Sequence, residues 1–282
     1  MAILNYPLEA AMSNTHYLVI GATGKTGKRV TARLVAANKP VKAASRTGDV
    51  RFDWQDKSNW PEVFGNVKAV YVTYFPDLAM PGAQEDISTL CTLARQQQVE
   101  HITLLSGRGE EEAQACEQIV ASCGLSWTIV RASWFMQNFS EGLFAQFLLS
   151  GDVSLPVGDV KEPFVDVDDI ADIVFDSMIS EKHQNRLYEV TGATLYSFAE
   201  LVALFNRVLG RDVKFTTISA NAFSDNLTRL GVDQGTISML DYLFTEVLDG
   251  RNEKRAEGVQ QALGREPTSF EAFLRKNQHV FA

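Results

Sequence analysis

Residues 21–27 contain three glycines in the pattern G-x-x-G-x-x-G, a spacing that can bind a phosphate group. A short apolar run precedes this segment, and a helix-compatible stretch begins near Thr26. Between a strand and a helix, Gly21 would permit a tight turn, Gly24 would let the backbone approach a pyrophosphate, and Gly27 would let the helix pack closely. Free N–H groups at the helix N-terminus would attract the anion. The loop therefore predicts a dinucleotide site.

Two other interpretations of this loop compete with a dinucleotide site. Gly24-Lys25-Thr26 could end a P-loop, but that motif requires a glycine at position 19, where the chain has Val19. Alternatively, the segment could be a glycine-rich turn that binds nothing. The spacing G-x-x-G-x-x-G, rather than G-x-G-x-x-G, is typical of the short-chain dehydrogenase class of Rossmann proteins and favours the dinucleotide.

The second predicted strand ends in residues that favour NADP(H) over NAD(H). Proteins that prefer NAD place an acidic residue about 20 residues beyond the loop, on the ribose 2′-hydroxyl. This chain has Ser45 and Arg46 there, which would suit a 2′-phosphate; the alternative is a solvated surface arginine. Asp53, after the third predicted strand, is placed to accept a hydrogen bond from the adenine amino group, or else to cap its own loop.

A Tyr-x-x-x-Lys pair, which many short-chain dehydrogenases use as a proton relay, is absent from the sequence. None of the seven tyrosines has a lysine four residues later, and no lysine occurs between Lys68 and Lys161. Reduction of an iminium or a quinone depends less on a dedicated protein acid than reduction of a ketone does. Positioning against the nicotinamide could then supply most of the acceleration. We assign no catalytic residue from the sequence.

Other polar residues follow the predicted strands and could line a ligand crevice. They are Tyr74, Ser106, Arg108 and residues 110–112. We expect Tyr74 and Ser106 to lie at the cofactor. The three glutamates are also typical of the first turn of a helix, and we interpret Asp168 and Asp169 as helix caps.

Six apolar, β-branched runs alternate with helix-compatible stretches up to residue 134, which predicts a parallel sheet covered on both faces. The predicted strands are 16–21, 41–45, 50–54, 69–74, 101–106 and 128–134, with helices that begin near Thr26, Asn59, Gln84 and Glu110. Because crossovers between parallel strands are right-handed, the expected fold class is α/β, a Rossmann doubly wound parallel sheet. Its ligand crevice would lie at the carboxyl ends of the strands, near Gly21, Arg46, Tyr74, Ser106 and Trp134.

The strict alternation lapses after Trp134. The elements expected there are helices at 135–150, 168–179, 197–209 and 237–248, strands at 152–157 and 187–191, and a last helix from Ser269. We expect a flexible lead-in at 1–14, an NAD(P)-binding domain at 15–134, and a smaller, mainly helical lobe on the substrate side at 135–282, with 187–191 returning to the main sheet. The aromatic and sulfur side chains after the sixth strand could roof an apolar substrate pocket or belong to the core; they are Phe135, Met136, Phe139, Phe144 and Phe147.

Composition argues against several classes of partner. The chain has 282 residues and a formal net charge of −9, which opposes binding to nucleic acid or to an anionic membrane surface. It has no apolar stretch of the length that spans a bilayer. Cys91, Cys116 and Cys123 lack metal-ligand spacing and are an odd number, so we expect no metal and a reducing cytoplasm.

Several segments together resemble the NmrA-like group of atypical short-chain dehydrogenases, and most of all its festuclavine and agroclavine dehydrogenase branch. The segments are 21–27, 44–46, 51–54, 104–107, 163–170 and, above all, 130–141 (VRASWFMQNFSE). The resemblance implies that the pyrophosphate is held by Gly21, Thr23, Gly24, Lys25, Thr26 and Gly27. It also implies that Arg46 lies at the adenosine end, and that Phe135 and Asn138 lie towards the nicotinamide and the substrate. Ala132 departs from the group, since many relatives have proline there.

We therefore expect an NADPH-dependent reductase of a small conjugated or aromatic electrophile, of the quinone or iminium type, that acts by hydride transfer. One alternative is a non-catalytic NADP(H)-sensing regulator that binds another protein, which the missing Tyr-x-x-x-Lys pair would suit. Another is an isomerase or an ether-reducing relative. An open, partly apolar cavity beside the nicotinamide would favour the reductase, whereas side chains would fill that space in a sensor.

Overall fold

A computed structural model describes residues 15–281, so the expected lead-in at 1–14 lies outside the described residues. Within them, seven parallel strands form one sheet in the order β3-β2-β1-β4-β5-β6-β8. The strands are β1 (His16–Ile20), β2 (Val41–Ser45), β3 (Val50–Arg51), β4 (Val67–Val72), β5 (His101–Gly107), β6 (Ser126–Ala132) and β8 (Arg186–Val190). The order reverses direction between β1 and β4, which confirms the doubly wound Rossmann fold and creates a crevice there.

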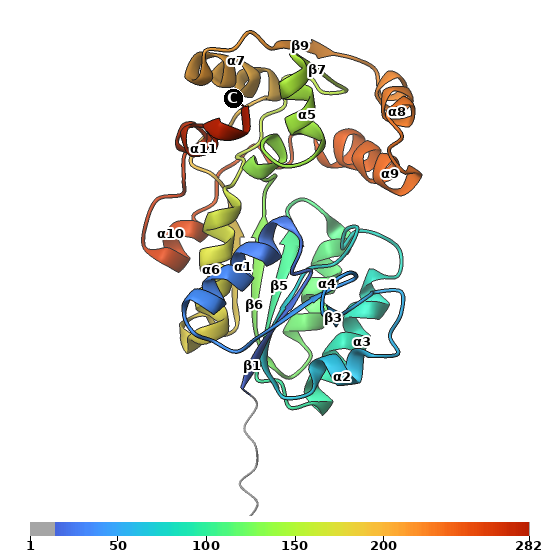
Figure 1. Ribbon diagram of the computed structural model, residues 1–282, viewed down its shortest axis with the longest axis vertical. Helices are drawn as coiled ribbons and strands as arrows, with labels where there is room; N and C mark the ends of the chain where they lie inside the picture. Colours follow the sequence, from blue (N-terminus) through green and yellow to red (C-terminus); the bar gives the residue numbers. More distant parts are fainter. Residues whose placement is uncertain (1–14, 282) are drawn as a thin grey trace, which may run out of the picture.

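Helices cover both faces of this sheet, as the apolar strands require (Figure 1). Leu18 and Ile20 point to one face, which is covered by α2 (Trp60–Phe64), α3 (Ala83–Gln96) and α4 (Glu111–Ala121). Tyr17 and Val19 point to the other face, which is covered by α1 (Lys25–Ala36), α6 (Val167–Ile179) and α10 (Gly258–Leu263). Successive residues of one strand therefore enter two different cores.

A smaller, mainly helical lobe sits above the carboxyl ends of the strands (Figure 1). Its elements are η1 (Met136–Phe139), α5 (Leu143–Ser150), β7 (Asp152–Leu155), α7 (Phe198–Leu209), β9 (Lys214–Thr217), α8 (Ala220–Arg229), α9 (Gln234–Tyr242), η3 (Leu243–Val247), α11 (Phe270–Lys276) and η4 (Gln278–Phe281). Strands β7 and β9 pair in parallel. Phenylalanine rings form much of the lobe's core. Phe139 and Phe164 contact each other, and each of them contacts Phe198 and Phe270, with ring centres 5.4 to 6.2 Å apart.

The third strand is shorter than the sequence predicts, because β3 ends at Arg51 rather than at residue 54. Phe52 and Trp54 turn into the core instead, and the ring of Phe52 stacks on Trp60 with centres 5.0 Å apart. Burying these large rings stabilises the fold more than three further ladder positions at a sheet edge would.

Two helices beyond residue 134 also pack on the sheet. Both α6 and α10 share a core with β1, β4 and β8, although the sequence assigns residues 135–282 to a separate lobe apart from 187–191. Helix α10 approaches β8 closely through Gly258, where a Cβ would lie 2.2 Å from the carbonyl oxygen of Glu189. The lobe and the sheet domain are thus interleaved in sequence.

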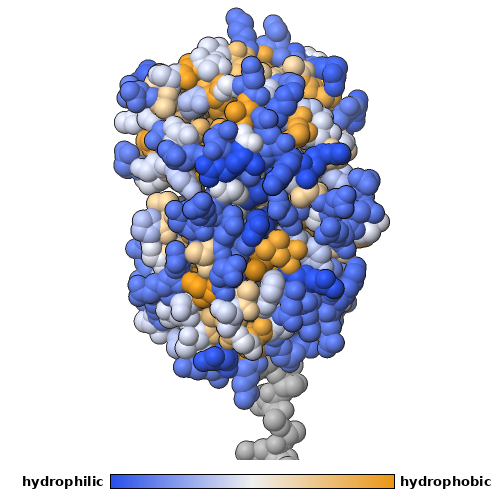
Figure 2. Space-filling model, turned by 180° about the vertical axis from the view of Figure 1, so that it is seen from behind, coloured by the Kyte–Doolittle hydropathy of each residue, from blue (hydrophilic) through white to orange (hydrophobic). Residues whose placement is uncertain are grey.

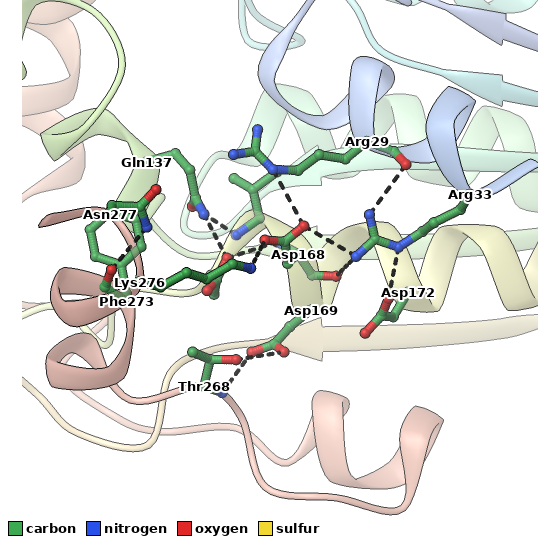
Figure 3. A network of polar contacts seen from close by, with 12 residues as sticks. Arg29, Arg33, Gln137, Asp168, Asp169, Asp172, Thr268, Phe273, Lys276 and Asn277 are labelled. Atoms are coloured by element: carbon green, nitrogen blue, oxygen red, sulfur yellow. Dashed lines mark hydrogen bonds and ion pairs between the residues drawn. The ribbon is translucent and has the colours of Figure 1, made fainter. Parts of the chain in front are cut away.

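Ion pairs join the helix that follows the glycine loop to the second half of the chain (Figure 3). Arg33 of α1 contacts Asp172 at 2.7 Å and Asp168 at 3.1 Å, both on α6. Lys276 of α11 contacts the other oxygen of Asp168 at 2.7 Å. Such partly exposed pairs contribute little stability one by one. Together they fix α1 relative to the lobe.

The residue that caps α6 differs from the prediction. Asp166 accepts a hydrogen bond from the backbone N–H of Asp168 at 2.8 Å, so Asp166 is the N-cap. Asp168 and Asp169 lie in the first turn, where Asp169 accepts hydrogen bonds from Thr268 (Figure 3). Both acidic residues therefore act as tertiary contacts beside the positive end of the helix dipole.

The molecular surface is largely hydrophilic, and Figure 2 shows hydrophobic residues in separate patches on the face opposite to that of Figure 1. The large hydrophobic side chains that are exposed come from several elements: Val35, Phe75, Leu149, Ile179, Leu187 and Leu230. In the part of the chain that the structure describes, no helix has the length and apolarity needed to cross a membrane.

Candidate functional site

The glycine loop connects β1 to α1 and needs glycine at two positions. Gly21 has a φ of +77°, and a Cβ there would lie 2.1 Å from the hydroxyl oxygen of Thr73. A Cβ on Gly27 would lie 2.2 Å from the carbonyl oxygen of Gly21. The first glycine therefore makes the turn, and the last lets the helix pack against it. Gly24, in contrast, is exposed and has an extended backbone.

The N-terminus of α1 is open to an anion. Gly24 is its N-cap, no side chain caps the helix, and its first turn contains no acidic residue. Thr23 is exposed, Thr26 is buried, and the side chain of Lys25 reaches a neighbouring cavity. Burial lowers the pKa of Lys25, while Glu141 opposes this change. The free N–H groups and the nearby ammonium group together suit a phosphate.

Gly27→Ala should destabilise the protein even without a ligand. The new methyl group would meet backbone atoms of Gly21, which cannot rotate away, so we expect a loss of about 1–3 kcal/mol. Denaturant unfolding measures this change. Gly65→Ala is the matched control, because a Cβ there would meet its nearest neighbour at 3.3 Å with an ordinary φ of −56°. Equal stability of the two variants would contradict the loop geometry.

The residues expected at the adenosine end lie at the carboxyl ends of β2 and β3. Ser45 is buried, and within residues 15–281 its hydroxyl has no hydrogen-bond partner. Arg46 is exposed, and its guanidinium carbon lies 4.3 Å from the centre of the Phe75 ring. Asp53 is half-buried and accepts a hydrogen bond from the backbone N–H of Gln55 at 3.1 Å. Asp53 thus caps its own loop, and its contact with adenine stays a prediction.

A cavity of about 430 Å³ lies at the carboxyl ends of β4, β5 and β6, beneath the lobe. This volume is in the usual range for a small-molecule site. The sheet domain contributes Lys25, Thr73, Tyr74, Asp77, Ser106, Gly107, Arg108 and Glu110, and the segment after β6 contributes Ser133, Trp134, Phe135 and Asn138. The lobe lines the other side of the cavity with apolar side chains that include Phe144, Met239, Leu240, Leu243 and Val247.

Of the residues assigned to the cofactor or to the substrate side, five line this cavity: Lys25, Tyr74, Ser106, Phe135 and Asn138. The crevice candidates Arg108, Glu110, Trp134 and Phe144 line it as well. Ser106 is buried, and its hydroxyl oxygen has no hydrogen-bond partner among residues 15–281, so it is free to bind a ligand. The hydroxyl of Tyr74 instead donates to Asp86 at 2.7 Å, and burial raises its pKa. Tyr74 therefore offers the cavity a ring rather than an acid.

The structure divides the aromatic candidates after β6. Phe135 and Phe144 line the cavity. Met136 and Phe139 are buried in the lobe's core, and Phe147 packs against that core while partly exposed. The pocket interpretation therefore holds for Phe135 and Phe144, and the core interpretation for Met136, Phe139 and Phe147, while Phe144 belongs to the buried core as well.

The three consecutive glutamates also separate. Glu111 and Glu112 are exposed in the first turn of α4, as the helix interpretation predicts. Glu110 is the N-cap residue, is 5% exposed, and faces the cavity beside Asp77. The sequence analysis missed Asp77. Its position shortly after β4, at the crevice edge, is the signal that could have found it.

No cluster of three or more histidine, cysteine or acidic side chains that could hold a metal ion occurs within residues 15–281. The three cysteines Cys91, Cys116 and Cys123 are free thiols.

Comparison with known proteins supports the resemblance drawn from the sequence. The sequence model of the NmrA-like family matches residues 112–274, which is more than half of the chain. The curated relatives include the NAD(P)H azoreductase of Xenophilus azovorans, 25% identical over 94% of this chain and 98% of its own length. The festuclavine dehydrogenase of Aspergillus fumigatus is 27% identical over 93% of this chain and 97% of its own length. Prestalk A differentiation protein A of Dictyostelium discoideum is 25% identical over 92% of this chain and 91% of its own length.

Solved structures share the fold at lower sequence identity. The triphenylmethane reductase of Citrobacter in complex with NADP(H) is 18% identical, with a TM-score of 0.77 over 93% of this chain and 99% of that one. The NADPH-dependent quinone oxidoreductase of Escherichia coli is also 18% identical, with a TM-score of 0.75 over 94% of this chain and 100% of that one. Both superpose on the sheet domain and the lobe together, which confirms the fold along nearly the whole chain.

Proposed function

The chain belongs to the NmrA-like family, and on that premise we propose that it is an NADPH-dependent reductase of a small conjugated or aromatic electrophile. The observation that carries the proposal is the cavity at the carboxyl ends of β4, β5 and β6, because it is open, largely apolar and adjacent to the glycine loop. We infer that it works in a reducing cytoplasm, where its three free thiols would persist.

The residues of the loop fit a dinucleotide. Gly21 and Gly27 form a turn in which a Cβ on either residue would clash with its neighbours. The N-terminus of α1 has no side-chain cap and would present N–H groups to a pyrophosphate. Lys25 would neutralise part of its charge from the cavity side. When bound, the reduced nicotinamide would supply a hydride, and the chain's own residues would orient it and exclude water.

The end of β2 favours NADPH over NADH. Arg46 is exposed, with its guanidinium carbon 4.3 Å from the centre of the Phe75 ring. Ser45 precedes it in the chain, and the Ser45 hydroxyl has no hydrogen-bond partner among residues 15–281. A guanidinium and a hydroxyl group suit a 2′-phosphate, whereas a 2′-hydroxyl would need an acidic partner.

The acceptor side favours a planar, conjugated molecule. Phe135, Phe144 and Met239 give the cavity apolar walls, while Asn138 and Ser106 offer a few polar contacts. Two of the relatives carry names that suit this chemistry, an azoreductase and a festuclavine dehydrogenase. The substrates we propose for this chain are therefore quinones, azo compounds and cyclic iminium compounds.

The test combines calorimetric titration with an activity screen. The purified chain is titrated with NADPH and NADH, and NADPH oxidation is then followed spectrophotometrically with quinones, azo dyes and cyclic iminium compounds. We expect tighter binding of NADPH than of NADH, and turnover with at least one acceptor class. Tight binding without turnover across the panel would instead support an NADP(H)-sensing regulator. Absence of binding would contradict both functions.

A further inference from the structure

The carboxyl groups of Asp77 and Glu110 meet at the wall of the cavity. Asp77 follows β4, Glu110 follows β5, and both residues line the cavity. The charge of Asp77 acts on the buried carboxyl group of Glu110. Two carboxyl groups at one cavity wall repel each other when both are ionised, so one of them favours the protonated form. The pair therefore holds a proton beside the space for the acceptor.

Glu110 is the member of the pair that carries this proton. Its side chain is buried against Gly107, where a Cβ would lie 2.3 Å from Oε2, and that oxygen has no hydrogen-bond partner among residues 15–281. Burial and then the charge of Asp77 raise the pKa of Glu110 to about 9. Glu110 is consequently protonated at neutral pH, with one oxygen left for a ligand.

The neighbouring ionisable groups, within the described part of the chain, do not neutralise the pair. Arg108 directs its guanidinium to Glu189 at 2.6 Å and to the carbonyl oxygen of Asn252 at 2.7 Å. The other ionisable groups that act on the pair are Glu112 and Cys116 of α4 and Tyr242 of α9. Arg251 lies beyond Tyr242, where it forms an ion pair with Asp249. The surroundings thus favour the protonated form of Glu110.

We propose that Glu110 donates a proton to the acceptor during its reduction, with Asp77 as the positioning residue whose charge keeps this proton on Glu110. The proposal rests on the reductase function proposed above and specifies its substrate class. Because the chain has no Tyr-x-x-x-Lys pair, Glu110 would take the place of the tyrosine as the proton donor.

The transfers balance for a neutral acceptor. A hydride from a reduced nicotinamide dinucleotide adds to a quinone or an azo compound, which leaves negative charge on its oxygen or nitrogen and the dinucleotide oxidised. The O–H bond of Glu110 breaks, its proton joins that atom, and the carboxylate regains a proton from water. An iminium needs the hydride alone, because it becomes a neutral amine. Glu110 therefore favours quinones and azo compounds as substrates.

The experiment compares Glu110→Gln with the wild type on two kinds of acceptor. Glutamine keeps the shape of the side chain but has no acidic proton, so kcat with an azo dye should fall roughly 10²–10⁴-fold. The fall with a quinone should be smaller, roughly tenfold, because the anion that hydride addition to a quinone leaves depends less on a protein acid. Turnover of a cyclic iminium and NADPH binding by calorimetry should stay within about threefold of the wild type. Glu111→Gln is the matched control, since Glu111 is exposed on the same helix turn.

A second readout does not depend on activity. Infrared spectroscopy of the dinucleotide-free protein at about pH 8 should detect the protonated carboxyl group of Glu110, because Glu162, whose pKa burial raises only to about 7, is largely ionised there. Glu110→Gln should lack that band while Glu111→Gln retains it. A missing band in the wild type would overturn the proposal. Retained quinone turnover in Glu110→Gln would overturn it too, while leaving the reductase function intact. A wild type that turns over no acceptor would overturn the reductase function and this role together.

Asp77→Asn tests the positioning role through the pH profile. The wild-type kcat with a quinone should decline as the pH rises through about 9, because Glu110 then loses its proton. Removing the charge of Asp77 lowers the pKa of Glu110, so the decline should shift to lower pH. An unchanged profile would show that Asp77 acts only in packing, and would contradict the role of its charge.

Discussion

Gly24→Val is expected to abolish dinucleotide binding while leaving the fold intact. Gly24 has an extended backbone, φ −75° and ψ 174°, that valine adopts readily, and a Cβ there would have its nearest neighbour at 3.2 Å. The branched side chain would occupy the exposed space before the N-terminus of α1, where the pyrophosphate approaches. We expect the Kd for NADPH to rise at least about 100-fold, measured by calorimetry, which corresponds to roughly 3 kcal/mol.

The matched control for this variant is Gly158→Val. Gly158 is also exposed, and a Cβ there meets no atom within 4 Å, but it lies outside the loop. Both variants should melt within a few degrees of the wild type. Tight NADPH binding by folded Gly24→Val would contradict the phosphate role of the loop.

Arg46→Ala should weaken NADPH far more than NADH. A charge-assisted hydrogen bond to a phosphate contributes about 1.5–3 kcal/mol, so the Kd for NADPH should rise about 10- to 100-fold. NADH has no 2′-phosphate, and its Kd should change by less than about threefold. Calorimetric titration of the same preparation with both dinucleotides measures the difference.

The control for this prediction is Arg186→Ala, which removes an exposed arginine at the amino end of β8, opposite the cavity. It should leave both dissociation constants unchanged. If Arg46→Ala weakens NADPH and NADH equally, Arg46 contacts a part of the dinucleotide that the two share, and the preference for NADP(H) loses its basis.

Local signals in the sequence were sufficient for the sheet and the loop. The apolar strands are short and bounded by glycine or polar residues, so β1, β2 and β5 could be located within one or two residues. The fold class and the NmrA-like resemblance are confirmed. Gly21 and Gly27 leave no room for a side chain, and the spacing of the glycines in the sequence is enough to predict this.

Features that depend on contacts distant in sequence could not be predicted. The aromatic packing that ends β3 at Arg51 needs Trp60, and the cavity wall needs Met239 and Leu243, far from the sheet domain in the chain. Glu110 looked like an ordinary helix-turn glutamate, because only the fold buries it and brings Asp77 to the same cavity wall. The pattern of hydrophobic residues predicts which face of a helix or strand is buried. It does not predict which polar side chains from distant segments come together in the fold.

A single-turnover measurement tests the central claim of NADPH-dependent reduction most directly. The wild-type chain is mixed with an equimolar amount of NADPH, an excess of a quinone or an azo dye is added rapidly, and the absorbance of the reduced nicotinamide is followed. The account predicts that the bound NADPH is oxidised while the acceptor is reduced in equal amount, and that Gly24→Val shows neither change. NADPH that binds tightly but stays reduced with every acceptor would contradict the reductase function.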